Sequence, residues 1–446
     1  MKIFKWNPNK IELYNRLSPG RGFLFAERRN IEQKIETIYK DIAMEGDKKL
    51  FEYTQKFENH DLDSKTIKVS RQEMDIAWQS VPEQDRKTIL FAKKRIENFH
   101  KKQLPREFTI REKSGAVLRQ RVVPIERVGI YIPAGRAPLF STVLMTVIPA
   151  KIAGVKEIVM ISPWPNGQMN PYILVAAQLV GVDEIYKVGG AQGIVALAHG
   201  TRSIRKVNKI VGPGSVWVSE AKAYVARMGK VGIDTLAGPS EVVILVDGYC
   251  PARWVAADLL SQLEHGEDSR AVLITPKQDY AEQVCNEFEA LVKSSERKIY
   301  LHGSIKHFAT AIWTDDLEQA IGAVNKLSPE HLEIMSQHPR NILEKIVNAA
   351  SIFVGPFSPV AIGDYLAGPN HVLPTDYAAR FASPLGVDDF VKRQSVVEFS
   401  KEALLKLGPV AERMAELEGL DGHARAIRIR REALAGKKLP KKRGQK

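Results

Sequence analysis

Two short motifs of the sequence place histidine beside side chains that could take part in chemistry. In S-Q-L-E-H-G, Gln262 and His265 are three residues apart near the end of an apolar helix, so both lie on one helix face. In S-P-E-H-L-E-I, Glu330 and His331 directly follow a proline. A proline-started helical turn would place this pair at the positive end of a helix dipole, which favours a neutral imidazole suited to general-base catalysis. A purely structural role, in which Ser328 caps the helix and Glu330 lies in its first turn, predicts the same sequence.

A third motif, G-D-Y-L-A-G-P-N-H-V-L-P-T, brackets Asp364 and His371 with glycine and proline. We expect a loop of constrained backbone there, and functional groups concentrate on such loops. Farther along, Glu418 and His423 lie on a basic C-terminal helix. Asp364 and His423, taken with the amide and imidazole of the first motif, would offer two imidazoles, one carboxylate and one amide oxygen, a set that suits zinc. Spacing alone cannot group these residues, and core or capping roles could equally explain Gln262 and His265.

The elements that must position these groups alternate between strands and helices. From about Val128, short β-branched runs such as V-G-I-Y-I, E-I-V-M-I-S, E-V-V-I-L-V-D and A-V-L-I-T are separated by helical stretches. This alternation predicts an α/β fold with two Rossmann-like parallel-sheet domains, an N-terminal helical arm and a C-terminal helical extension. Such sheets bind ligands beyond the carboxyl ends of their strands. The G-x-G-x-x-G fingerprint is absent, since Gly189-Gly190 and Gly212-Pro213-Gly214 lack the third glycine.

The same pattern predicts that the smaller sheet is inserted into the larger one. Near Val128 the sequence changes from helices with charged faces to alternating β-branched runs and helical stretches. The segment from about Tyr131 to Ala237 is compact enough to be a separate βα unit. The predicted divisions are an N-terminal arm (1–24), a larger α/β domain (25–129 and 239–381), a smaller α/β domain (130–238), a helical C-terminal extension (382–436) and a basic disordered tail (437–446).

Composition narrows the class of protein. The 446 residues are 44% hydrophobic and 26% charged, as in ordinary globular proteins, and the two cysteines favour a reducing cytoplasm over a secreted disulfide scaffold. No apolar run reaches the roughly 18 residues of a membrane helix. The net charge of +13 owes much to residues 437–446, which hold six bases and no acids. We therefore expect no membrane association and no specific nucleic-acid binding.

Taken together, the motifs resemble histidinol dehydrogenase. The resemblance covers nearly the whole chain, from V-G-I-Y-I-P-A-G at Val128–Gly135 to His423, and includes G-G-A-Q, G-I-D-T-L-A-G-P-S-E-V and D-L-L-S-Q-L-E-H-G besides the motifs above. It implies a cytoplasmic homodimer that oxidises L-histidinol through the aldehyde to L-histidine, using two NAD⁺ and one Zn²⁺ per subunit. These are the final steps of histidine biosynthesis. A related dehydrogenase for another small alcohol is the alternative.

The resemblance also implies roles for individual residues. Glu330 and His331 would be the acid–base pair, and the C-terminal segment with Glu418 and His423 would complete the partner subunit's site. The other implied roles fall into three sets: zinc ligands Gln262, His265, Asp364 and His423; substrate contacts Ser240, Gln262, His265, His331, Asp364, His371, Glu418 and His423; and NAD⁺ contacts Tyr131, Gln192 and Ser215.

Two positions depart from the family pattern. Pro133-Ala134-Gly135 stands where the family usually has P-G-G, and Ser215 stands where it usually has asparagine. A hydroxyl replaces an amide at Ser215, so we expect weaker NAD⁺ binding than the family pattern would give. Two rival interpretations rank lower: an aldehyde dehydrogenase-like enzyme with Cys250 as nucleophile, and a nucleic-acid-binding protein that uses the basic tail.

Overall fold

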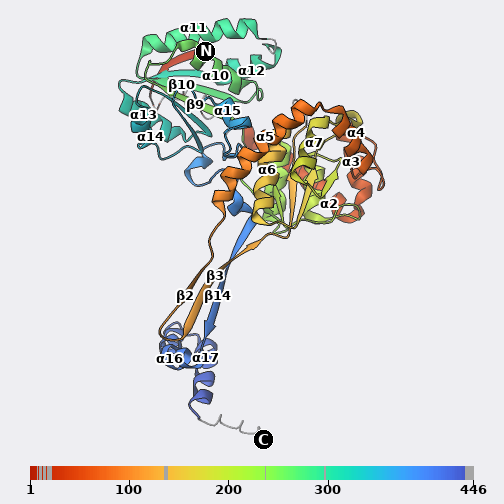
Figure 1. The fold of residues 1–446 in the computed structure, drawn as a ribbon, viewed down its shortest axis with the longest axis vertical. Helices are drawn as coiled ribbons and strands as arrows, with labels where there is room; N and C mark the ends of the chain where they lie inside the picture. Colours follow the sequence, from red (N-terminus) through yellow and green to blue (C-terminus); the bar gives the residue numbers. More distant parts are fainter. Residues whose placement is uncertain are drawn as a thin grey trace. The chain divides into compact units, whose positions relative to one another are not determined.

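The computed structural model describes residues 1–7, 9, 13, 17, 23–134, 139–236, 238–295 and 298–436. The chain divides into two compact units, shown as ribbons in Figure 1. The first unit comprises Met1–Leu104 and Ile125–Phe390, and the second comprises Pro105–Pro124 and Val391–Lys446. The predicted basic tail and Gly135 lie outside the described residues.

The first unit contains a six-stranded sheet in which every neighbouring pair is parallel. The strand order is β1-β11-β10-β9-β12-β13, so strands far apart in the sequence are paired. Parallel neighbours require crossover connections, which the intervening helices supply. The strands are β1 (Lys2–Lys5), β9 (Glu241–Val246), β10 (Arg270–Thr275), β11 (Ala309–Trp313), β12 (His331–Met335) and β13 (Ser351–Val354).

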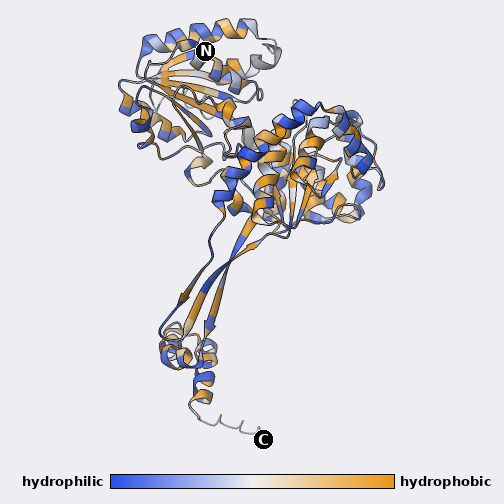
Figure 2. Ribbon diagram, viewed as in Figure 1, coloured by the Kyte–Doolittle hydropathy of each residue, from blue (hydrophilic) through white to orange (hydrophobic). Residues whose placement is uncertain are grey.

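Alternate residues of this sheet face two separate cores. Val242 and Ile244 pack in one core with residues of α10 and α11, whereas Val243 and Leu245 pack in another with residues of α13 and α14. A strand that is buried on both faces reads as a continuous apolar run, as E-V-V-I-L-V does, and Figure 2 shows these strands as largely apolar. The flanking helices are α10 (Ala252–Leu263), α11 (Gln278–Ser294), α12 (Lys298–Phe308), α13 (Leu317–Leu327), α14 (Pro339–Leu343) and α15 (Val360–Tyr365).

A second parallel sheet, of five strands in the order β6-β5-β4-β7-β8, completes the first unit. Its strands are β4 (Arg127–Tyr131), β5 (Glu157–Ile161), β6 (Glu184–Tyr186), β7 (Lys209–Val211) and β8 (Gly232–Ile233). Its crossover helices are α6 (Phe140–Ala153), α7 (Pro171–Val180), α8 (Gly190–His199) and α9 (Val216–Arg227). The two parallel sheets confirm the predicted fold class.

The N-terminal helices pack on the five-stranded sheet. Ile42 of α2 and Leu50 of α3 share one core with Ile161 of β5 and Val195 of α8. We expected residues 25–129 to accompany the larger sheet, so that assignment was wrong for these helices: their apolar faces are buried against the smaller sheet. The predicted helical arm also begins as a strand, since β1 joins the larger sheet. The helices are α2 (Phe23–Glu45), α3 (Asp47–Glu58), α4 (Arg71–Ser80) and α5 (Glu83–His100).

The second unit joins an antiparallel sheet to two helices. The strand order is β14-β3-β2, with β2 at Phe108–Arg111, β3 at Ala116–Pro124 and β14 at Val391–Phe399. The helices that follow are α16 (Lys401–Leu417) and α17 (Asp421–Leu434). The expected helical extension over 382–436 therefore also contains a strand, because β14 pairs with β3, more than 250 residues earlier in the chain. Of the described helices, none is both long and apolar enough to cross a membrane.

Candidate active site

The predicted catalytic pair lies at the amino-terminal edge of the six-stranded sheet. His331 is the first residue of β12, and its neighbour on β9 is Val242, next to the start of that strand. Gln262 lies at the end of α10, which returns to this edge after β9. The expectation that functional groups of this sheet follow the carboxyl ends of its strands was wrong. The reason is that the catalytic motif begins a strand here instead of following one.

Glu330 and His331 are held by the backbone of β9. The Nδ1 of His331 contacts the carbonyl oxygen of Glu241 at 3.0 Å, and the Oε2 of Glu330 accepts a hydrogen bond of 2.8 Å from the Glu241 amide. The predicted proline-started helical turn does not form. Ser328, with φ of 50°, ends helix α13, and the chain enters β12 directly. An Nδ1–H that donates to the Glu241 carbonyl leaves Nε2 as the nitrogen that can accept a proton.

Electrostatics also differ from the expected neutral imidazole. Burial lowers the pKa of His331, but the charge and contact of Glu330 outweigh burial and raise this pKa to about 9. The Glu330 carboxylate lies 3.5 Å from Nδ1. Burial also raises the pKa of Glu241 to about 7, against the opposing charge of Arg270 at 3.3 Å. The edge therefore concentrates titratable groups with shifted pKa values, which is characteristic of functional sites.

Three of the predicted zinc ligands come together beside this pair. The Nε2 of His265 lies 4.0 Å from the Oδ2 of Asp364, and its Nδ1 contacts the Gln262 carbonyl oxygen at 3.2 Å. Gln262 is 2% exposed, and neither its Oε1 nor its Nε2 has a hydrogen-bond partner among the described residues. A buried amide without partners is costly, and a bound ligand would remove that cost. The orphaned amide therefore fits a metal-binding role.

The predicted substrate contacts His371 and Ser240 lie in the same unit. The Nδ1 of His371 contacts the carbonyl oxygen of Asp364 at 2.9 Å, and its Nε2 lies 3.4 Å from the hydroxyl of Thr142 on α6. Burial lowers the pKa of His371. Ser240 directly precedes β9, and its carbonyl oxygen accepts a hydrogen bond from the amide of Arg270. Asp364 belongs to the short helix α15 rather than to the expected loop.

A pair of carboxyl groups that the motifs did not indicate, the half-buried Asp258 and the buried Glu333, joins these elements. Asp258 on α10 is hydrogen-bonded to Glu333 on β12, and burial raises the pKa of both groups. The Oε1 of Glu333 accepts a hydrogen bond of 2.7 Å from the Val360 amide at the start of α15. Its Oε2 has no donor among the described residues unless the pair holds a proton. Their spacing in the sequence could have indicated them. Asp258 is four residues before Gln262, on the same helix face, and Glu333 is two residues after His331, on the same sheet face.

Two predicted site residues, Glu418 and His423, belong to the second unit. Both are exposed there, with Glu418 at the end of α16 and His423 in the first turn of α17. That Glu418 and His423 lie in the same site as the other predicted residues remains a prediction. Within the part of the chain that the structure describes, no group of three or more His, Cys, Asp or Glu side chains could hold a metal ion. The first unit thus brings together one imidazole, one carboxylate and one amide of the predicted set.

The predicted NAD⁺ contacts follow strands of the five-stranded sheet at its carboxyl edge. Tyr131 ends β4, and Gln192 lies in the first turn of α8 after β6. Both are nearly fully buried, and the amide nitrogen of Gln192 donates to Glu58 at 2.9 Å. Ser215, by contrast, is exposed at the start of α9, and its hydroxyl makes no capping bond within the described residues. Of these three residues, Ser215 is the one whose side chain is exposed, so it is the predicted contact that best fits a cofactor.

The loop before Ser215 is anchored by an ion pair inside the sheet's edge. Lys222 and Asp234 form a buried salt bridge, and they bind the carbonyl oxygen and the amide of Gly212 at 3.0 and 2.7 Å. An added Cβ at Gly212 would lie 2.2 Å from the Tyr131 carbonyl oxygen. Glycine is therefore required where this loop meets the end of β4.

Neither cysteine is suited to nucleophilic chemistry. Cys250 and Cys285 are buried and unpaired, and burial raises the pKa of both thiols. A reactive cysteine needs a lowered pKa and an electropositive setting. The structure therefore gives no support to Cys250 as a nucleophile.

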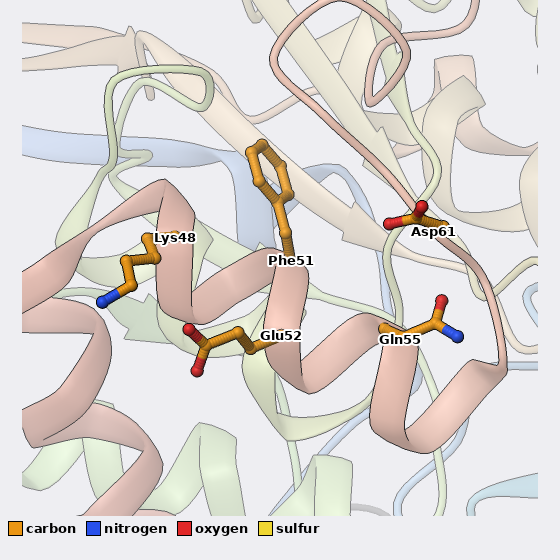
Figure 3. A pocket seen from close by; sticks show the side chains of 5 residues that line it. All are labelled: Lys48, Phe51, Glu52, Gln55 and Asp61. Atoms are coloured by element: carbon orange, nitrogen blue, oxygen red, sulfur yellow. The ribbon is translucent and has the colours of Figure 1, made fainter.

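A surface hollow of about 650 Å³ beside α3 contains none of the predicted site residues (Figure 3). Four of its side chains come from α3 and one from the segment after it. We attach no function to this hollow. It is lined by Lys48, Phe51, Glu52, Gln55 and Asp61.

The chain is similar to known proteins over most of its length. The family model for histidinol dehydrogenase matches residues 25–431. The chain belongs to the histidinol dehydrogenase family. It is 44% identical over 400 residues to histidinol dehydrogenase of Syntrophotalea carbinolica, covering 90% of this chain and 92% of that one. The histidinol dehydrogenase of Aquifex aeolicus is 44% identical over 411 residues, covering 92% of this chain and 94% of that one.

The fold agrees as well. A crystal structure of histidinol dehydrogenase from Elizabethkingia anophelis matches with a TM-score of 0.90 and 37% identity, over 98% of this chain and 99% of that one. Membership of the histidinol dehydrogenase family makes the chain an oxidoreductase. The motifs that carried the resemblance, from Val128 to His423, all lie within the matched residues.

Proposed function

We propose that this protein oxidises L-histidinol to L-histidine through the aldehyde, with two NAD⁺ and a zinc ion in each subunit, as the final steps of histidine biosynthesis. Family membership supports the reaction class, and the amino edge of the six-stranded sheet supports the site. The observation that carries the proposal is the orphaned amide of Gln262, buried beside His265 and Asp364 and within the same unit as the Glu330–His331 pair.

Gln262, His265 and Asp364 would hold the zinc ion, with His423 as the fourth ligand. Their nitrogen and oxygen donors match the preference of zinc. When bound, zinc would fix the imidazole and amine of histidinol and polarise its oxygen. We propose that Glu418 and His423 are contributed by the partner subunit of a homodimer.

The chain's own residues would manage the protons. Oxidation of an alcohol requires a base for its hydroxyl proton, and Nε2 of His331 is the nitrogen left to accept it. The Glu241 carbonyl oxygen orients the ring at 3.0 Å. Since the pKa of His331 is about 9, its imidazole is mainly protonated at neutral pH, and a cation held by the neighbouring ligands would lower that pKa. Glu330 would activate water for the second oxidation.

Substrate and cofactor would meet across the two parallel sheets. His371 would contact histidinol together with Ser240, and the hydroxyl of Thr142, on the helix α6 that follows β4 of the five-stranded sheet, lies 3.4 Å from the Nε2 of His371. Tyr131, Gln192 and Ser215 would contact NAD⁺, with Ser215 as the exposed group.

The second unit supports the proposed homodimer. Helix α16 exposes Val410, Met414 and Leu417, which are 63%, 60% and 69% accessible and lie on one helix face. Figure 2 shows that apolar residues also recur along β2, β3 and β14. Such exposed apolar faces mark protein–protein contact sites.

A direct turnover assay tests the proposal. Wild-type protein incubated with zinc, L-histidinol and NAD⁺ should yield two NADH and one L-histidine per histidinol. A His265→Ala variant should lose both bound zinc and turnover, while its circular dichroism spectrum stays unchanged. Turnover of a different small alcohol, without turnover of histidinol, would favour the related dehydrogenase instead.

A further inference from the structure

Helix α3 carries a carboxylate on its buried face. Leu50, Thr54 and Glu58 are spaced by four residues and are all buried, so they form one stripe toward the five-stranded sheet. The hollow of Figure 3 lies on other residues of the same helix. Glu58 is only 9% exposed. A carboxylate in this position needs partners, because an isolated buried charge is strongly destabilised.

Three hydrogen-bond donors converge on Glu58 from loops more than 100 residues away. Its Oε1 accepts from the amide of Gly189 at 2.8 Å and from the Nε2 of Gln192 at 2.9 Å. Its Oε2 accepts from the amide of Trp164 at 2.9 Å. Trp164 follows β5, and Gly189 follows β6. One side chain therefore joins two neighbouring loops at the carboxyl edge of the five-stranded sheet.

The close packing around this carboxylate explains the glycines of the G-G-A-Q motif. A Cβ at Gly189 would lie 2.5 Å from the Pro163 side chain. Gly190 has φ of 57°, and a Cβ there would lie 2.6 Å from the Oε1 of Gln192. Both glycines thus permit the geometry that brings Gln192 to Glu58. One N–H of the Gln192 amide donates to Glu58, so its other N–H and its Oε1 are the groups left for a ligand.

The side chain of Glu58 also lies at the amino terminus of α8. The amide of Gly189, which precedes the first turn of α8, points to Glu58. In dinucleotide-binding folds an anionic phosphate takes such a position. Here the protein's own carboxyl group, whose pKa burial raises to about 7, occupies this position in place of a phosphate of the cofactor.

We propose that Glu58 is a positioning residue for cofactor binding, which holds Gln192 and the loops after β5 and β6 in their binding conformation. The proposal rests on the proposed use of NAD⁺. It accounts for a buried carboxylate that the chemistry of the six-stranded sheet does not use. It also accounts for why Gln192, although buried, belongs to the cofactor edge.

The test compares Glu58→Gln with a matched variant of the same helix, Asp47→Asn. Asp47 also binds a loop, since its carboxylate accepts from the amide and hydroxyl of Ser203 at 3.2 and 2.8 Å. Calorimetric titration of NAD⁺ into the zinc-loaded protein, without histidinol, gives the Kd. Glu58→Gln cannot accept all three bonds, and we expect its Kd to rise about tenfold, the equivalent of one charge-assisted hydrogen bond. Asp47→Asn should leave the Kd unchanged, and in Glu58→Gln the KM for histidinol and the zinc content should match those of the wild type.

A double variant separates positioning from general stability. If Glu58 acts through Gln192, the Kd of Glu58→Gln/Gln192→Leu should equal that of Gln192→Leu alone. Fully additive effects, or equal effects of Glu58→Gln and Asp47→Asn, would overturn the proposal. Should Glu58→Gln fail to fold, Glu58→Asp keeps the charge but shortens its reach, and the same rise in Kd is expected.

Failure of this inference and failure of the proposed function look different. Wild-type turnover of histidinol together with an unchanged Kd in Glu58→Gln would overturn only the role of Glu58. A wild type that binds no NAD⁺ would overturn both.

Discussion

The two parallel sheets of the first unit carry their predicted functional residues at opposite edges. In the six-stranded sheet these residues lie at the amino edge, where the Gln262 amide lacks partners among the described residues and the pKa of His331 is raised to about 9. In the five-stranded sheet they lie at the carboxyl edge, where Glu58 accepts a hydrogen bond from Gln192. The side-chain amide of Gln262 thus has no hydrogen-bond partner among the described residues, whereas that of Gln192 has one in Glu58. A buried glutamine can therefore be a candidate ligand-binding residue at one edge, as Gln262 is, and part of an internal hydrogen-bonded scaffold at the other, as Gln192 is.

The largest expected effect comes from removing the base at the amino edge. His331→Gln keeps a donor for the Glu241 carbonyl oxygen but cannot accept a proton. Loss of a general base typically costs 10²–10⁴-fold in rate, so we expect kcat for histidinol to fall by about that factor. Steady-state NADH production measures it. The matched variant His199→Gln, at the end of α8, should retain wild-type kcat, and equal losses in both variants would remove the distinction.

The two glutamines should respond in opposite directions to the same substitution. Gln262→Met removes two buried atoms without partners, so the metal-free protein should gain about 1–2 kcal/mol in free energy of unfolding while losing zinc affinity. Gln192→Met removes a hydrogen bond to a carboxylate, and should lose about 1–3 kcal/mol. Urea denaturation of the metal-free proteins measures both, and chelator competition measures zinc. A loss of stability in both variants would show that the Gln262 amide is satisfied in solution.

A further effect should appear in the pH dependence of stability. The folded pKa of His331, about 9, lies above its ordinary value of 6.5. The protonated imidazole therefore stabilises the folded state fully below pH 6.5, and this contribution is lost as the pH rises through 9. The stability difference between metal-free wild type and His331→Gln should shrink over that range. A difference that is independent of pH would mean that the imidazole is neutral in the folded protein.

Much of the fold could be predicted because its signals are local. The runs E-V-V-I-L-V and A-V-L-I-T became β9 and β10, and the apolar stretches between the β-branched runs became crossover helices. Strand β14 was missed, because V-K-R-Q-S-V-V-E-F is charged and its pairing with β3 depends on residues far away in the sequence. The N-terminal helices were assigned to the wrong sheet because an amphipathic pattern shows which helix face is buried but not which sheet that face packs against.

The site shows the same division between local and long-range signals. The motifs placed Gln262, His265 and Asp364 in one candidate set, and the structure brings these three together. The state of His331 could not be read from them, since its pKa depends on Glu330 and on the Glu241 carbonyl oxygen of another strand. Glu58, Asp258 and Glu333 were missed because charged residues are usually exposed, and only tertiary contacts bury them.

The smallest effect concerns the one predicted cofactor contact with an exposed polar group. Ser215 lies at the start of α9, beside a loop fixed by the Lys222–Asp234 ion pair, so a substitution there should alter binding without altering the fold. Ser215→Asn restores the amide usual in the family and should lower the KM for NAD⁺ about two- to tenfold, because an added hydrogen bond contributes about 0.5–1.5 kcal/mol. Initial rates at varied NAD⁺ and saturating histidinol measure the change. The KM for histidinol serves as the internal control. Ser215 follows β7 of the five-stranded sheet, whereas the predicted substrate contacts of the first unit lie near the six-stranded sheet. An unchanged KM for NAD⁺ would place Ser215 away from the cofactor, and the carboxyl edge would then contact NAD⁺ through the Gln192 loop that Glu58 holds.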